Sequence, residues 1–89
     1  MEKELLEKLQ LIAESYGKTS DLRSYVKNGN GMYLDESNRE IRFNYILDKQ
    51  EAARIAQDII DVMKEFGYSA IIVRDKKCTE IMYECVLRY

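Results

Sequence analysis

Apolar residues in the middle of the chain recur with the period of a helix. Between Asp48 and Gly67 they are spaced three and four residues apart, with polar residues between them. The apolar set is Ala52, Ile55, Ala56, Ile59, Val62, Met63 and Phe66. Asp48 suits an N-cap, Glu51 stands at the capping-box position, and Gly67 suits a helix end. This pattern predicts an amphipathic helix with one buried face.

Alternating apolar and polar residues flank this helix on both sides. Residues 41–47 and residues 81–88 both have period two, which is typical of strands that bury one face. The expected core positions are Ile41, Phe43, Tyr45, Leu47, Ile81, Tyr83, Cys85 and Leu87. Residues 70–73 are apolar on both faces and predict a further strand.

Two turns complete the prediction of a hairpin on each side of the helix. A short strand at residues 32–35 is expected to pair with residues 41–47 through the polar turn 36–39. Residues 75–78 are expected to turn the second hairpin. Because both hairpins are antiparallel and a helix joins them, they predict a four-stranded, mainly antiparallel sheet packed by helices.

A second helix is expected at the N-terminus. Its apolar stripe begins near Glu2 and comprises Leu5, Leu6, Leu9, Ile12, Ala13 and Tyr16. Gly17 is placed to end it. No repeat or linker interrupts the chain, so residues 1–89 are expected to form a single α+β domain with the order helix, β-hairpin, helix, β-hairpin.

Composition narrows the function classes. The chain has 89 residues, 46% of them hydrophobic, which suffices for one modest core. Its net charge of −2 argues against general polyanion binding. Glu and Lys in the first turns do not suit a signal peptide, and no apolar run reaches the roughly 20 residues of a membrane span. A cytoplasmic protein without membrane contact is therefore expected.

The sequence contains no recognisable set of catalytic or metal-binding residues. The chain has no histidine, which removes the Ser-His, Cys-His and His-metal mechanisms. Cys78 and Cys85 lie seven residues apart on an extended segment, too far apart for a disulfide, and two thiols cannot complete a four-ligand zinc site. We therefore expect no metal, no cofactor and no enzyme activity.

The predicted order of elements resembles one repeat of the LAGLIDADG homing endonucleases. Residues 28–33 lie where that family ends its signature helix and enters its first strand. The resemblance covers the topology of most of the chain. That family holds its metal with an acidic residue at the end of the helix, and here asparagines and glycines stand in its place, so the resemblance implies a fold and no cleavage.

The sheet face away from the central helix is a first candidate surface. Its expected apolar side chains are Ile46, Ile71, Val73, Met82 and Val86, among Arg42, Glu80, Glu84 and Arg88. The N-terminal helix is expected either to cover this face or to share the first one. Otherwise a second copy of the chain, as a homodimer, or another partner covers it.

The segment at residues 16–33 is a second candidate surface, because it combines basic and aromatic residues. The candidate partner-binding residues are Lys18, Arg23, Tyr25, Lys27 and Tyr33. Basic side chains beside aromatics suit phosphate contact and base stacking. Tyrosine is equally an anchor of protein interfaces, and an ordinary solvated loop explains the same residues.

Three functions follow from different classes. The first is a small non-catalytic protein-binding module, such as an inhibitor by which a phage or mobile element blocks a host system, in the manner of an anti-CRISPR protein. The second is a nucleic-acid-binding module that uses residues 16–33. The third is a small enzyme that works through carboxylates, tyrosine or Cys78. The lack of a recognisable set of catalytic residues favours the first.

Overall fold

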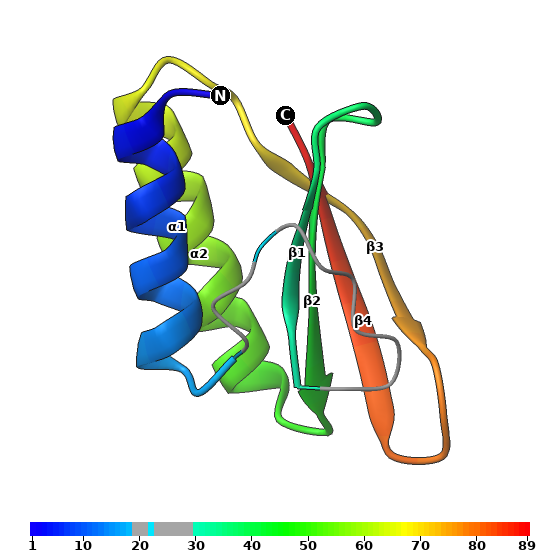
Figure 1. Ribbon diagram of the computed structural model, residues 1–89. Helices are drawn as coiled ribbons and strands as arrows, with labels where there is room; N and C mark the ends of the chain where they lie inside the picture. The colour runs from blue at the N-terminus through cyan, green and yellow to red at the C-terminus, as the bar shows by residue number, and fades with distance from the viewer. Residues whose placement is uncertain (19–21, 23–29) are drawn as a thin grey trace.

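The structure, a computed structural model, describes residues 1–18, 22 and 30–89. Its elements, shown in Figure 1, are α1 (Lys3–Ser15), β1 (Met32–Asp35), β2 (Glu40–Ile46), α2 (Lys49–Glu65), β3 (Ile71–Lys77) and β4 (Met82–Arg88). The order of helix, hairpin, helix, hairpin confirms the predicted α+β fold.

The four strands form one antiparallel sheet in the order β1-β2-β4-β3. The central pair β2 and β4 sets Tyr45 opposite Tyr83, and β1 sets Met32 opposite Phe43. In the β3·β4 pair the register shifts between Ile72 and Arg74, which is a β-bulge or similar irregularity. The two helix-flanking hairpins thus join along β2 and β4, and β1 and β3 form the edges.

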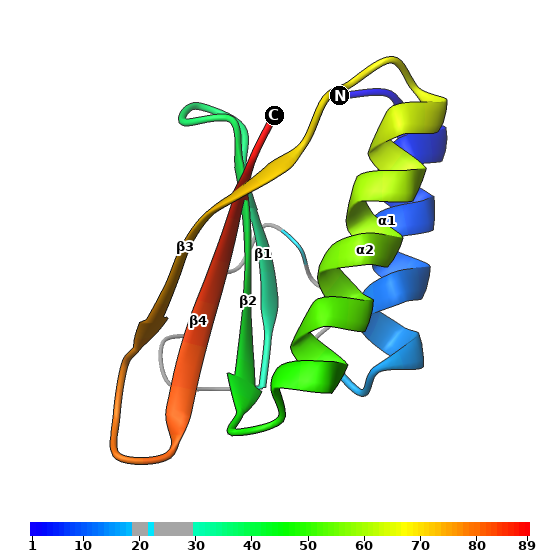
Figure 2. The same ribbon diagram turned by 180° about the vertical axis from the view of Figure 1, so that it is seen from behind.

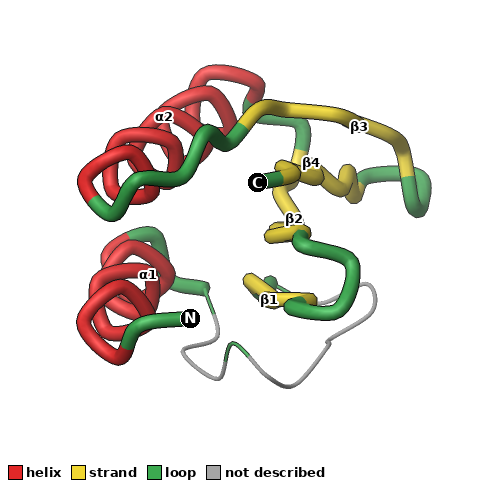
Figure 3. Tube along the Cα trace, turned by 90° about the horizontal axis from the view of Figure 1, so that it is seen from above, coloured by secondary structure: helices red, strands yellow, loops and turns green. Residues whose placement is uncertain are grey.

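Both helices lie on the same face of the sheet. Figure 3 shows α1 and α2 side by side on one side of the strands, and the two helices contact each other. Of the two expected positions for the N-terminal helix, the structure therefore has the one shared with α2. On the other face Val86 and Met82 are buried, whereas Ile46 and Ile71 are exposed. Val73 is also exposed and lies at the register shift of β3.

The core fills the space between the helix pair and the sheet. Its largest fully buried side chains are Tyr45, Phe43, Leu5, Leu9, Leu22, Met32, Ile41, Ile55, Ile59, Met63 and Leu87, with Val86 on the other face. They come from both predicted helices, from the alternating positions of the strands and, for Leu22, from the segment between α1 and β1. The helical stripes and the period-two faces therefore point inward as predicted.

The residues predicted to cap and to end the helices do so in the structure. The Asp48 carboxylate accepts hydrogen bonds from the backbone N–H groups of Gln50 (3.1 Å) and Glu51 (3.0 Å), so it caps α2. Gly67 ends the helix with φ +85°, and Gly17 has φ +68° after α1. Both glycines occupy the left-handed conformation that terminates many helices.

Three predicted strand and turn boundaries are wrong. The strand at residues 41–47 ends at Ile46, because Leu47 turns out of it with φ +50° and is exposed rather than in the core. Ile81 also lies outside its strand, before β4, and is exposed. The second hairpin does not turn at residues 75–78, since β3 continues to Lys77 and the turn lies at residues 78–81.

We expect Ile59→Ala to destabilise the protein by about 2–5 kcal/mol, because the fully buried side chain leaves a cavity as well as losing its transfer free energy. Chemical denaturation followed by circular dichroism measures the change. Leu11→Ala is the matched control, since Leu11 is exposed on α1 and its truncation should change stability by less than about 0.5 kcal/mol. Equal effects of the two changes would show that the α2 stripe faces solvent.

Candidate functional site

The edge strand β3 differs from every other element in its exposure. All seven of its residues are exposed, whereas its neighbour β4 buries most of its side chains. β3 pairs only with β4 among the described strands, so the backbone on its other side has no strand partner there. Figure 2 shows β3 at the margin of the sheet, away from β1. An edge of this kind is a template for pairing with another chain.

The first half of β3 is apolar. Ile71, Ile72 and Val73 are consecutive, and all three are exposed. The ladder sets Ile71 opposite Arg88, on the face away from the helices, and Ile72 opposite Leu87, on the helix side. Apolar side chains are therefore available on both faces of the edge. The sequence predicts a strand at residues 70–73, and in the structure this strand lies at the edge of the sheet and extends to Lys77.

The second half of β3 is basic. Arg74, Lys76 and Lys77 are exposed, and none of them makes a side-chain hydrogen bond or ion pair with the described residues. Lys76 lies opposite Glu84 in the ladder, but the two side chains form no ion pair with each other. Three basic side chains within four residues thus remain available at one end of the strand.

Asp75, the one acidic residue of β3, is already engaged on the helix side. Its carboxylate accepts hydrogen bonds from the Tyr45 hydroxyl and from Lys49 Nζ, the latter at 3.0 Å. The Lys49 ammonium lies 4.8 Å from the ring centroid of Tyr83, which stacks on Tyr45. Hydrogen bonds to Tyr45 and then to Asp75 raise the pKa of Lys49, so it stays charged at neutral pH. The Asp75 charge is therefore balanced, and the free charge of β3 is positive.

The outer face of the sheet, the other surface considered from sequence, carries a cluster of charged residues at the end where β2 begins and β4 ends. Glu40 is 4% exposed and accepts hydrogen bonds from Arg42 and Arg88, each at 2.8 Å. The hydrogen bond from Arg88 is the main cause that lowers the pKa of Glu40, and Arg42 adds to it. Both carboxylate oxygens of Glu40 are paired and Val86 beside them is buried, so these residues present little apolar surface to a partner. Arg42 Nε is buried without a hydrogen-bond partner among the described residues.

Lys18, the first predicted partner-binding residue, is built into the fold. It is 8% exposed, and its ammonium donates hydrogen bonds of 2.6 Å to Asn30 Oδ1 and to the backbone carbonyl of Asn44. Burial lowers the pKa of this amine. The side chain thus links the end of α1 to β2, and it has a structural role whether or not it also touches a partner.

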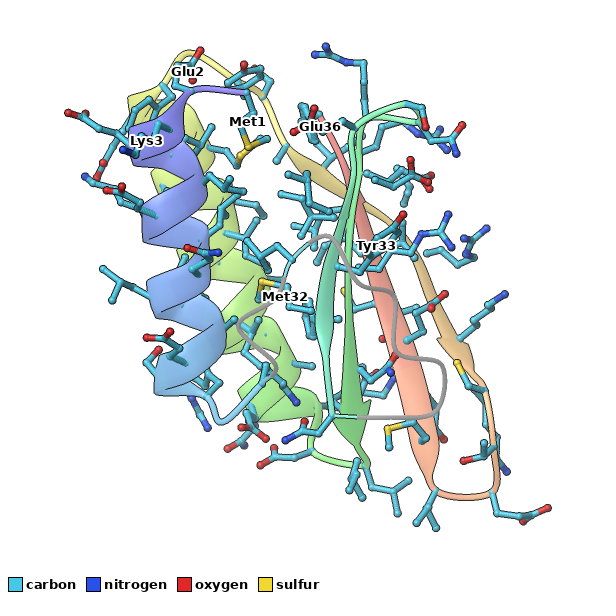
Figure 4. All side chains as sticks on the ribbon, in the orientation of Figure 1. Met1, Glu2, Lys3, Met32, Tyr33 and Glu36 are labelled. Carbon is cyan, nitrogen blue, oxygen red and sulfur yellow. The ribbon has the colours of Figure 1, made fainter. Side chains whose placement is uncertain are left out.

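The other predicted binding residues divide into one that is placed and three that are not. Tyr33 lies on β1 opposite Arg42 and is half-buried. In Figure 4 it lies on the side of the sheet away from the helices, whereas its neighbour Met32 points toward them. Arg23, Tyr25 and Lys27 lie outside the described residues. Their role in binding stays a prediction.

Few groups in the described part of the chain suit chemistry at a metal or a thiol. No cluster of three or more acidic or cysteine side chains within residues 1–18, 22 and 30–89 could hold a metal ion. Cys85 is buried, and burial raises the pKa of its thiol to about 12. Cys78 is exposed in the turn after β3, where it lines a shallow depression with Lys77, Thr79 and Glu80.

No helix in the described ranges is long and apolar enough to cross a membrane. No family model, no curated protein and no solved structure matches this chain. The function is therefore inferred from the residues of this chain, of which those of the β3 edge are the most exposed set.

We expect Lys18→Met to lower the free energy of unfolding by about 1.5–3 kcal/mol, because two hydrogen bonds from a charged donor are lost and the Asn44 carbonyl is left with one partner fewer. Thermal and urea denaturation measure it. Lys3→Met, at an exposed lysine of α1, should change stability by less than about 0.5 kcal/mol. If the two variants are equally stable, Lys18 does not support the fold.

Proposed function

We propose that the chain is a small non-catalytic protein-binding module and that β3 is its binding edge. The observation that carries the proposal is a seven-residue edge strand that is exposed over its whole length. Unpaired N–H and C=O groups on such a strand hydrogen-bond to an extended segment of another protein, which adds to the sheet as a further strand.

The apolar half of β3 gives this edge a driving force that backbone hydrogen bonds alone lack. Ile71, with 61% of its surface exposed, Ile72 and Val73 form a continuous apolar run. Covering them removes apolar surface from water on both sides of the added strand. These three residues are exposed and contribute nothing to the described core. Their burial against a partner would therefore stabilise a complex.

The basic half also suits phosphate groups, which keeps nucleic acid as the second candidate. Arg74, Lys76 and Lys77 could contact a nucleic-acid backbone. Stacking platforms for bases are absent from β3, and the nearby rings of Tyr45 and Tyr83 are stacked on each other under Lys49. Protein binding therefore explains both halves of the strand, and nucleic-acid binding explains only one.

Affinity capture with matched variants tests the proposal. Ile71→Lys places a charge in the apolar half, and we expect it to reduce recovery of the captured protein by about tenfold or more. Leu11→Lys is the control, because Leu11 is 63% exposed, close to the 61% of Ile71, but lies on α1. Both are surface changes that should leave the fold intact, which circular dichroism checks.

Three outcomes contradict the proposal. Equal loss in the Ile71 and Leu11 variants would show a general effect of added charge. Loss in Ile81→Lys alone would move the interface to the opposite end of the sheet, where Ile46, Leu47 and Ile81 are exposed. Loss of the captured material on nuclease treatment would assign the basic residues to nucleic acid.

A further inference from the structure

We infer that the partner segment of β3 is an extended peptide in which acidic residues precede apolar ones, added antiparallel to the strand. This inference depends on the proposed function, since it takes β3 as the binding edge. It goes further because it specifies the chemistry and the direction of the peptide.

The order of residues along β3 supplies the first part of the argument. The strand begins with three apolar residues and ends with Arg74, Lys76 and Lys77, with Asp75 between them. Because the Asp75 charge is balanced by Lys49, a neighbouring strand meets a neutral apolar half and a positive half. Cross-strand pairs of opposite charge stabilise a sheet, and apolar residues pair best with apolar ones.

Strand direction supplies the second part. Every pair in the sheet is antiparallel, and antiparallel ladders are slightly more stable per residue than parallel ones. An antiparallel peptide begins opposite Lys77 and ends opposite Ile71. Its acidic residues must therefore come first, and its apolar residues must follow. Charge complementarity across the edge then fixes the register of the peptide.

A second copy of the chain fits this edge less well. Two β3 strands that pair antiparallel over their full length, centred on Arg74, bring the two Arg74 side chains opposite each other. The same register sets Lys76 and Lys77 opposite the apolar residues Ile72 and Ile71. Like charges directly opposite each other destabilise a ladder. The charge pattern that favours an acidic peptide thus disfavours self-pairing.

Binding of synthetic peptides to the full chain tests the inference. We would titrate ¹⁵N-labelled protein with two seven-residue peptides, the length of β3, one with glutamates before valines and one with the same residues in reverse order. The acidic-first peptide should bind about tenfold more tightly, as expected for a few exposed ion pairs, and should shift the amide signals of residues 71–77. Added salt should reduce this preference.

Charge reversal provides the matched variant. Lys76→Glu combined with Lys77→Glu should reverse the charge that the edge prefers. A peptide with lysines before valines should then bind more tightly than the peptide with glutamates before valines. Lys64→Glu is the control, because Lys64 is exposed on α2, and it should leave the preference unchanged. A purely structural effect of the double change would weaken binding of both peptides alike.

The inference is overturned if both peptide orders bind equally, if neither binds, or if the shifted amides lie outside β3. It is also overturned if a single-stranded oligonucleotide displaces the peptide from residues 74–77 at lower concentration, or if the same amides shift with protein concentration alone. Loss of the captured protein in Ile71→Lys together with any of these results would leave β3 as the binding edge and reject only the acidic-first peptide.

Discussion

The rest of the structure depends on burial of side chains between the helix pair and the sheet. α1, α2, β1, β2 and β4 all contribute buried residues, and β3 contributes none. β3 is held instead by its ladder with β4 and by the Asp75 contacts to Tyr45 and Lys49. β3 thus belongs to the sheet but not to the core. Its exposed apolar and basic residues are the basis of the proposed binding role.

The arrangement of charge follows from the same packing. Charged residues of the central strands pair with one another, as the Glu40 carboxylate does with Arg42 and Arg88. On the edge strand, one acidic residue is fixed by the fold and three basic ones remain available. Lysines on edge strands also discourage unwanted pairing. We propose that the same charges favour an acidic partner over a second copy of the chain.

Short-range sequence patterns predict the helices and strands of this fold well. The features that they do not predict depend on contacts between residues far apart in the sequence. The Asp48 cap, the stripe around Ile59 and the alternation through Phe43 each depend on a few neighbouring residues. Burial of Lys18 depends on Asn44, 26 residues away, so its basic character alone indicates a surface residue. The exposure of β3 depends on strand order and on α1 lying beside α2, and neither is encoded within the strand.

One signal could have identified the edge from sequence. Residues 75–78 indicate a turn when taken alone, but charged residues, lysine above all, are also typical of edge strands. Amide hydrogen exchange at low protein concentration tests the central claim most directly, because it reports whether the free side of β3 is open. The account predicts rapid exchange for the β3 amides that do not donate to β4 and slow exchange for the amides of β2 and β4. Uniform slow exchange along β3 would contradict it.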